Sequence, residues 1–510
     1  MIGLDGVSWD LIETWIKGGK LPFFKRAMDK GVYATNWTTI PCLTSPALPS
    51  FITGKNPAST GIFGFRKADG SIMSYNDIKD PAFWDLFAKN KSKIKSLVVN
   101  LRVTYPPRIK NGVIVAGTLT PSEESDYVYP KSYKKFFKGF HIEYDKNIKN
   151  QRLSEISKNY TAYTKLKFRK FERLFLRNKY PFGLLWIDLT DNIQHYAWKN
   201  KEIILEYFKN LEKMIKDFVK RLPSYNIILF SDHGFESVPK YAFHINEWLE
   251  RKKLLFAKGQ GVEKWKNKAE ISVYSKLYNT IGWIIYRVVP WSIHNKIYKM
   301  VKRFEKKSAE QKKTRAVVMD KTITKLSNLD MNKTKVYLDQ KWGLRIVKKN
   351  VKDYKAFRDK LIKELKCIKG IDGKSIFKNV YKREEVFKGK YLRDVPDIVF
   401  LTKQEYEIRD GFSSKLFKRI RIKRDVVGCH ENARNGIFLA YGPDIRRGGK
   451  IRDIQIYDLA PTVLHIMGSN IPKDMDGKVL NIFKKDSEPG KRKPRYFKED
   501  ERTVIDKIEI

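Results

Sequence analysis

The segment Ile227-Ile-Leu-Phe-Ser-Asp-His-Gly234 joins a short apolar run directly to a polar turn. Such a run, bounded by turn residues, is typical of a strand that is buried on both faces, as in a parallel sheet. Amphipathic stretches such as Leu21–Lys30 and Ile203–Arg221 separate similar runs in the first 240 residues. The other expected strands there are Ile2–Leu4, Ser96–Asn100, Gly112–Gly117 and Leu184–Leu189. This alternation predicts an α/β domain with a largely parallel sheet, whose functional residues gather at the carboxyl ends of the strands.

The pattern changes after residue 244, where lysine becomes dense and the apolar residues lose their regular spacing. We interpret this stretch as an inserted cap domain, because the strand pattern returns at Asp397–Thr402 and Gly436–Tyr441 and a helix is expected over Asp458–Met467. The predicted divisions are a first part of the core at 1–244, a cap at 245–385, a second part of the core at 386–482 and a charged tail at 483–510.

The charge of the chain is strongly unbalanced. Its 510 residues include 103 Lys and Arg against 57 Asp and Glu, which gives a formal net charge of +46. Such a charge attracts anions, including phosphorylated substrates, nucleic acid and acidic membrane surfaces. Because 42% of the residues are hydrophobic, the chain can form a sizeable core and does not have the composition of a disordered protein.

The sequence indicates a cytoplasmic protein. No apolar run is long enough to cross a bilayer, and no signal peptide is visible. The three cysteines, Cys42, Cys367 and Cys429, form no closely spaced pair, so a disulfide framework or a thiolate metal site is not expected. Met1 falls inside an expected strand, which suggests that the natural chain begins upstream and leaves association with a membrane surface as an alternative.

Six candidate metal ligands occur near the ends of expected strands or in a polar loop. They are Asp5, Asp191, His195, Asp232, His233 and His430. Each alone is a weak indication, because an Asp after a strand is usually a turn or capping residue. Their joint placement is more specific, since the chain has only seven histidines. Mixed Asp and His ligands favour zinc, and two ions about 4 Å apart can stabilise the attacking and leaving oxygens of a phosphoryl transfer.

The candidate nucleophile lies in Pro41-Cys-Leu-Thr-Ser-Pro-Ala-Leu-Pro-Ser50. Thr44 and Ser45 precede a helix that is expected to begin near Pro46, where Ser or Thr is commonly just an N-cap. The same position places a hydroxyl beside free N–H groups that attract phosphate, and metal coordination there would make the hydroxyl a better nucleophile. The spacing leaves both Thr44 and Ser45 open.

These segments resemble the type I phosphodiesterase/nucleotide pyrophosphatase family of the alkaline phosphatase superfamily. The matching motifs are Leu4-Asp5-Gly6, Leu43-Thr44-Ser45-Pro46, Thr53-Gly54 with Pro57 and Gly61-Ile62, Asp191-Asn-Ile-Gln-His195, Ser231-Asp232-His233-Gly234, Gly428-Cys-His430, Gly436-Ile-Phe438, Gly442-Pro443, Tyr457-Asp458 with Pro461-Thr462, and Met475-Asp476-Gly477.

The resemblance implies an alkaline phosphatase-like α/β/α sandwich with the insertion as a cap. It implies that Thr44, and not Ser45, is the nucleophile. It also implies two zinc sites, one formed by Asp191, His195 and His430, and the other by Asp5, Asp232, His233 and Thr44.

Two positions depart from the family pattern. Many members have His where this chain has Thr60, and many nucleotide pyrophosphatases have a phosphate-binding Asn where it has Phe65. Arg66 and Lys67 are candidates to donate to the phosphate in place of that Asn. Ser45 and His244 are further candidates for substrate contact, and the preference for mono- or diesters stays open.

We therefore expect a phosphodiesterase or nucleotide pyrophosphatase in which Thr44 attacks a phosphate ester and two divalent ions assist. Zinc is expected, with manganese or another divalent ion as the alternative. The same core also suits a phosphomonoesterase, a phosphotransferase or a phosphoglycerate mutase. The alternative of another class is a basic protein that binds nucleic acid or a membrane surface. Expected partners are a phosphorylated small molecule or nucleotide, with attraction to anionic surfaces and no obligate protein partner.

Overall fold

The computed structural model describes residues 1–67, 70–87, 94–140, 151–258, 326–420 and 426–498. The chain forms two compact units. The first comprises Met1–Val238, Glu384–Val395 and Ile422–Ile510, and the second comprises Pro239–Arg383 and Pro396–Arg421. None of the helices in the described ranges combines the length and the apolar character that a membrane span needs.

The first unit is built on a sheet with the strand order β18-β2-β17-β7-β1-β6-β3-β4-β5. A further strand of this sheet, β19, also pairs with β2. The pairs among β1, β3, β4, β6 and β7 are parallel, whereas β17 runs antiparallel to β7 and β2. The α/β fold with a largely parallel sheet is thus confirmed. Its strands are β1 (Ile2–Leu4), β2 (Val32–Trp37), β3 (Ser96–Leu101), β4 (Gly112–Ala116), β5 (Val128–Tyr129), β6 (Phe182–Ile187), β7 (Ile227–Phe230), β17 (Asn435–Tyr441), β18 (Gly449–Lys450) and β19 (Ile454–Gln455).

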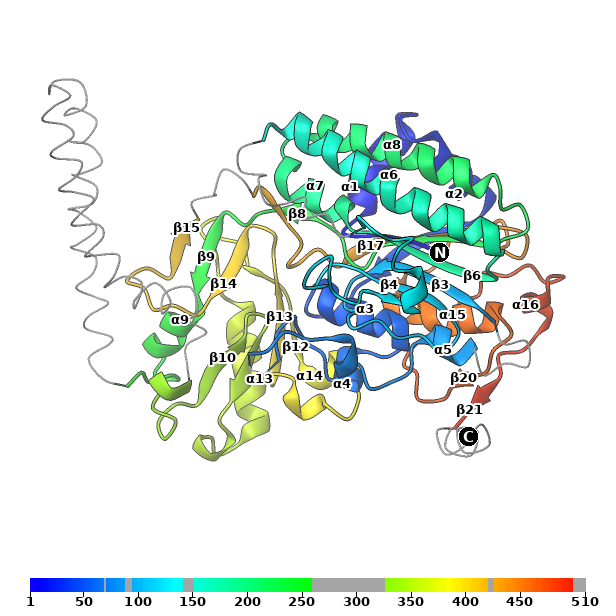
Figure 1. Ribbon diagram of the computed structural model, residues 1–510. Coiled ribbons are helices and arrows are strands. Elements are labelled where there is room, and N and C mark those ends of the chain that lie inside the picture. Colours follow the sequence, from blue (N-terminus) through cyan, green and yellow to red (C-terminus); the bar gives the residue numbers. More distant parts are fainter. Residues whose placement is uncertain (68–69, 88–93, 141–150, 259–325, 421–425, 499–510) are drawn as a thin grey trace, which may run out of the picture. The chain divides into compact units, whose positions relative to one another are not determined.

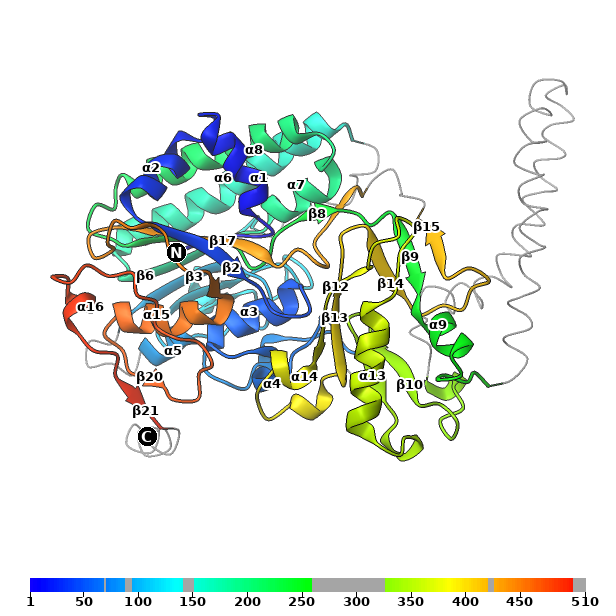
Figure 2. The same cartoon turned by 180° about the vertical axis from the view of Figure 1, so that it is seen from behind.

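Helices cover both faces of this sheet (Figures 1 and 2). One layer consists of α1 (Trp9–Lys17), α2 (Pro22–Lys30), α6 (Leu153–Asn178), α7 (Leu189–Ala197) and α8 (Lys201–Val219). The opposite layer contains α3 (Thr44–Thr53), α5 (Phe83–Phe87) and α15 (Leu459–Ile466). The first unit is therefore a three-layer α/β/α sandwich.

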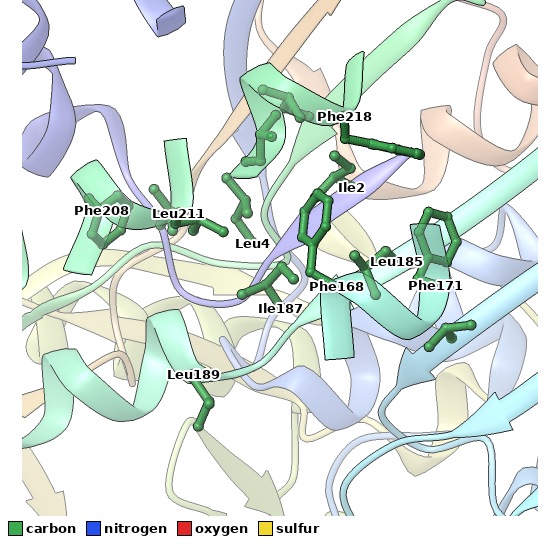
Figure 3. Packing of buried hydrophobic residues seen from close by; sticks show 14 of the residues in the cluster. Ile2, Leu4, Phe168, Phe171, Leu185, Ile187, Leu189, Phe208, Leu211 and Phe218 are labelled. Carbon is green, nitrogen blue, oxygen red and sulfur yellow. The ribbon is translucent and has the colours of Figure 1, made fainter. Parts of the chain in front are cut away.

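Alternation along the strands creates the two buried faces. In β6, Leu185 and Ile187 pack with the α6 and α8 layer, whereas Leu184 and Trp186 pack with the α3 and α15 layer. Figure 3 shows the first of these cores, in which side chains of β1 and β6 meet phenylalanines of α6 and α8. Because successive strand residues point to opposite faces, an apolar run predicts a strand covered on both sides.

Most expected elements appear within two residues of their predicted bounds. One difference matters for the site: the strand expected over Leu184–Leu189 ends at Ile187, because Asp188 already has a helical backbone and caps α7. Asp191 and His195 therefore lie on a helix that starts immediately after the strand.

Short elements complete the first unit. They are α4 (Pro57–Thr60), β8 (Glu236–Ser237), β16 (Gly428–Cys429), β20 (Ile471–Pro472), α16 (Glu488–Lys491) and β21 (Tyr496–Phe497). Part of the predicted charged tail belongs to this framework, since β21 pairs with β20 and the buried His465 ring bonds to the Pro489 carbonyl at 2.8 Å. Residues 499–510 lie outside the described ranges.

The second unit has its own core and two small sheets, with the orders β10-β11-β13-β12 and β14-β9-β15. Its elements are β9 (Tyr241–His244), α9 (Ile245–Arg251), β10 (Val336–Gln340), β11 (Gly343–Ile346), α13 (Tyr354–Lys366), β12 (Phe377–Lys382), β13 (Ile398–Thr402), β14 (Tyr406–Arg409) and β15 (Phe417–Arg419). The short helix α14 (Arg383–Val386) begins at the boundary, and its residues from Glu384 onwards belong to the first unit.

This unit differs in extent from the stretch interpreted as a cap. It includes Pro396–Arg421, which the sequence analysis assigns to the core, because β13 pairs antiparallel with β11 and β12. Residues 259–325, a large part of the predicted cap, lie outside the described ranges. The change in composition between the two halves of the core also predicts that the inserted cap sets substrate choice, and this stays a prediction.

Candidate metal centre

The six predicted ligand residues come together at the carboxyl ends of the central strands. Asp5 follows β1, and Asp232 and His233 follow β7. Asp191 and His195 lie on α7 after β6, and His430 lies between β16 and β17. Because β1 pairs in parallel with both β6 and β7, the ends of these three strands are adjacent.

Two overlapping groups of donor atoms form there. One ligand atom each from Asp191, His195 and His430 lie within 4.8 Å of one another, and so do atoms of Asp5, Asp191 and His233. Asp232 adjoins the second group through His233. Asp191 belongs to both groups, so its carboxylate lies between two candidate ion positions.

The separations between these donor atoms suit shared ions better than hydrogen bonds. Two ligands of one tetrahedral zinc ion, each about 2.0–2.2 Å from the metal, lie roughly 3.4 Å apart. The observed separations are 3.3 Å for Asp191 Oδ2–His195 Nε2, 3.9 Å for Asp191 Oδ1–His430 Nε2, 3.5 Å for Asp5 Oδ1–His233 Nε2 and 3.4 Å for Asp232 Oδ2–His233 Nε2.

Each carboxylate in the centre directs one buried oxygen towards these positions. Within the described ranges, Asp5 Oδ1, Asp191 Oδ1 and Asp232 Oδ2 have no hydrogen-bond partner. In Asp5 and Asp232, the other carboxylate oxygen accepts a hydrogen bond. Trp186 Nε1 donates to Asp5 Oδ2 at 3.2 Å, and the His233 amide donates to Asp232 Oδ1 at 3.1 Å. Burying an unsatisfied carboxylate oxygen is costly, so three of them in one place fit a site for cations.

The three imidazoles are oriented by backbone carbonyls. The Nδ1 atom of His195 lies 2.8 Å from Gly428 O, that of His233 lies 2.9 Å from Gly234 O, and that of His430 lies 3.2 Å from Cys42 O. Since a carbonyl only accepts hydrogen bonds, each Nδ1 carries a hydrogen, and the Nε2 atoms of the neutral His233 and His430 rings keep their lone pairs. This is the usual arrangement of histidines that ligate a metal through Nε2.

Burial also shifts the pKa values in the centre. It lowers the pKa of His233 and that of His430 to about 4, which keeps both rings neutral at pH 7. Burial, reinforced by the nearby charge of Asp191, raises the pKa of Asp232 to about 6 and raises that of Asp5. Burial opposes ionisation of Asp191 as well, but its contact with His195 outweighs this and lowers its pKa. Clustered carboxylates with raised pKa values gain from a cation, whereas neutral imidazoles are ready to bind one.

Thr44 is part of this centre. Its Oγ1 lies 3.1 Å from His233 Nε2 and is buried. The helix begins at Thr44 and not near Pro46, because Leu43 occupies the N-cap and makes no side-chain cap bond. The Thr44 hydroxyl therefore faces the ligand side chains. Ser45 Oγ, by contrast, is buried without a hydrogen-bond partner in the described part of the chain.

Three other predicted substrate contacts, Arg66, Lys67 and His244, make hydrogen bonds or ion pairs elsewhere, each within its own unit. Arg66 donates to Gly70 O at 2.8 Å, and Lys67 pairs with Asp77 at 3.2 Å. His244 belongs to the second unit, where its Nδ1 lies 2.7 Å from Gly411 O. Thr60 bonds to Pro57 O within α4.

Arg102 also adjoins this centre, although no motif in the sequence marks it. Its Nε lies 3.2 Å from Asp5 Oδ2, and its Nη2 lies 4.0 Å from Asp191 Oδ2. The residue directly follows β3, at the same edge of the sheet as the candidate ligands. The rule that functional residues follow the carboxyl ends of strands would have included it.

The chain was compared with known protein families and with solved structures. A sequence profile of the type I phosphodiesterase / nucleotide pyrophosphatase family matches residues 1–431. No curated protein matches the chain. Phosphonoacetate hydrolase from Sinorhizobium meliloti 1021, solved with phosphonoacetate, aligns with a TM-score of 0.53 and 13% identity over 90% of this chain and 93% of that one. Human ectonucleotide pyrophosphatase / phosphodiesterase 5 aligns with a TM-score of 0.48 and 13% identity over 94% of this chain and 96% of that one.

Proposed function

Because the chain belongs to the type I phosphodiesterase / nucleotide pyrophosphatase family of the alkaline phosphatase superfamily, we propose that it hydrolyses phosphodiester or pyrophosphate bonds with two divalent ions and Thr44 as nucleophile. The observation that carries the proposal is the set of three buried carboxylate oxygens that have no hydrogen-bond partner in the described part of the chain and lie near imidazole Nε2 atoms beside the Thr44 hydroxyl. The substrate class is a phosphorylated small molecule or a nucleotide.

The donor set suits two ions. Asp191, His195 and His430 would hold one ion, and Asp5, Asp232, His233 and Thr44 would hold the other. Zinc suits this mixture of carboxylate and imidazole ligands, and manganese is the alternative. When bound, the ions would supply positive charge for the phosphoryl oxygens and would lower the pKa of the hydroxyl.

In the proposed reaction, Thr44 is the attacking group, which its contact with His233 at 3.1 Å supports. Its Oγ1 forms a bond to phosphorus and loses its proton to solvent while the bond from phosphorus to the leaving oxygen breaks, and that oxygen takes up a proton. Water then forms a new bond to phosphorus and gives up a proton, the bond from phosphorus to Thr44 Oγ1 breaks, and Oγ1 takes up a proton. The first turn of α3 provides backbone N–H groups that have no partner within the helix, and these favour a phosphate at this end.

Assays on two aryl esters test the proposal. We would measure kcat/KM on bis(p-nitrophenyl) phosphate, a diester, and on p-nitrophenyl phosphate, a monoester. The protein would be assayed loaded with zinc, stripped of metal and reloaded with manganese. We expect metal-dependent cleavage of the diester at the higher kcat/KM. Preferential cleavage of the monoester would transfer the assignment to a phosphomonoesterase on the same core. Absence of zinc or manganese binding, or activity that survives complete metal removal, would refute the metal-centre proposal.

A further inference from the structure

The guanidinium of Arg102 contacts the acidic centre directly. It lies 3.2 Å from Asp5 Oδ2 through Nε and 4.0 Å from Asp191 Oδ2 through Nη2, and its side chain is largely buried. These two aspartates belong to the group that also includes His233. A permanent positive charge therefore adjoins two of the carboxylates that would neutralise the ions.

The fold builds this position at the end of β3. Asn100 has a left-handed backbone (φ 66°), and its Nδ2 donates to Trp186 O at 2.9 Å and to Asp188 Oδ1 at 3.0 Å. Lys167 Nζ lies 3.2 Å from Asn100 Oδ1 and from both Asp188 oxygens. The strand end is thereby fixed against β6 and α6, two residues before Arg102.

The arginine itself is anchored on α7. Its Nη2 donates to Asn192 Oδ1 at 3.3 Å, next to Asp191 in the chain. Arg102 is therefore held from its own strand end and from the helix that carries two candidate ligands.

The contacts indicate that charge, and not orientation, is the main effect of Arg102 on the carboxylates. Trp186 Nε1 already fixes Asp5 Oδ2, and the Asp5 amide bonds to Ile187 O at 3.0 Å. The 4.0 Å separation between Arg102 Nη2 and Asp191 Oδ2 is too long for a hydrogen bond. Two opposite charges at this distance still attract each other strongly in a buried setting.

We propose that Arg102 is a built-in counter-cation of the centre, which stabilises the carboxylates in the metal-free protein and competes with divalent ions for Asp5 and Asp191. The inference rests on the proposed metal centre. A guanidinium next to a dication raises the electrostatic energy of the loaded state, whereas beside uncompensated carboxylates it lowers the energy of the empty state. Both effects weaken metal binding, and removing the charge should strengthen it.

Zinc titration and thermal unfolding of matched variants test this. Arg102→Gln removes the charge, and Arg102→Lys keeps it. Arg221→Gln removes the charge of an exposed arginine that pairs with the partly buried Glu172 on the same unit, and it serves as the control. Dissociation constants would come from competition with a zinc-selective chelator, and melting temperatures would be measured in EDTA and in excess zinc.

We expect Arg102→Gln to bind the weaker of the two zinc ions at least about tenfold more tightly than the wild type. Its melting temperature should fall by about 2 °C or more in EDTA, and zinc should close that gap. Arg102→Lys and Arg221→Gln should bind zinc like the wild type.

Unchanged or weaker zinc binding by Arg102→Gln would overturn the inference, since a residue that only orients Asp5 gives weaker binding when it is removed. Equally tight binding by Arg102→Lys and Arg102→Gln would overturn it as well, because charge would then not be the cause. If the wild type binds no zinc or other divalent ion, the proposed function fails together with this inference. If the wild type binds and only the variant prediction fails, the proposed function stands.

Discussion

Thr44 and Ser45 are neighbours at the start of α3, but their hydroxyls have different surroundings. Thr44 Oγ1 lies 3.1 Å from His233 Nε2, whereas Ser45 Oγ has no partner in the described ranges. Thr44→Ala should lower kcat on the diester at least about 1,000-fold, because the attacking oxygen is lost. The fold should remain, with a stability change of about 1 kcal/mol.

The matched control is Ser45→Ala, which removes a hydroxyl that has no partner among the described residues and should retain most of the activity. Thr44→Ser should keep partial activity because it keeps the oxygen. If Ser45→Ala is inactive while Thr44→Ala is active, the nucleophile is one residue further along the chain. If both alanine variants are fully active, water attacks directly and no covalent intermediate forms.

Asp191 is the candidate ligand that both groups of donor atoms share. Asp191→Asn should therefore weaken the binding of both ions, whereas His195→Ala should affect mainly one, because His195 occurs in only one group. The measurement is zinc content per chain after dialysis, with the exposed Glu13→Gln as the control. Equal zinc loss in the Asp191 and His195 variants would contradict a shared carboxylate.

At the scale of secondary-structure elements, a buried ion pair joins α6 to the ends of β3 and β6. Lys167 and Asp188 are almost fully buried, and Thr118 Oγ1 also donates to Asp188 at 3.1 Å. Lys167→Met should destabilise the protein by about 3–5 kcal/mol, because it leaves Asp188 buried without its cation.

Urea unfolding of this variant and of Lys165→Met, an exposed change on the same helix, would measure the effect. The control should unfold like the wild type. If Lys167→Met is as stable as Lys165→Met, the pair does not secure the strand end that precedes Arg102.

At the scale of the whole molecule, all the candidate ligands and Thr44 belong to the first unit. Replacing the second unit with that of another family member should therefore leave zinc content unchanged. If the inserted cap sets substrate choice, as the sequence predicts, the same replacement should change which esters are cleaved. Zinc content and kcat/KM on a panel of mono- and diesters would be measured together. An unchanged order of substrates would contradict a role of the second unit in substrate choice.

The net charge of +46 provides a second prediction at this scale. KM for an anionic ester should rise with ionic strength, since salt screens the attraction that brings the substrate to the protein. KM would be measured from initial rates between about 20 and about 500 mM salt. Over this range the Debye length falls from about 20 Å to about 4 Å. A KM that does not vary with salt would show that the charge has no part in substrate capture.

The sequence by itself predicted the α/β class and the six residues whose side chains lie together. Both depend on local patterns: apolar runs that repeat along the chain, and Asp or His residues placed where those runs end. In a parallel sheet, the carboxyl ends of strands lie at one edge, so a one-dimensional pattern is sufficient to bring Asp5, Asp191 and Asp232 together.

Only the tertiary structure decided which strands pair and which distant atoms complete the centre. His430 is oriented by the carbonyl of Cys42, and His195 by that of Gly428, each more than 200 positions away in the chain. Arg102 carries no motif, and Pro396–Arg421 belongs to the second unit because β13 pairs with β11 and β12. Periodicity records which face of an element is buried, but it does not record what covers that face. That depends on contacts between segments far apart in sequence, which form when the chain folds.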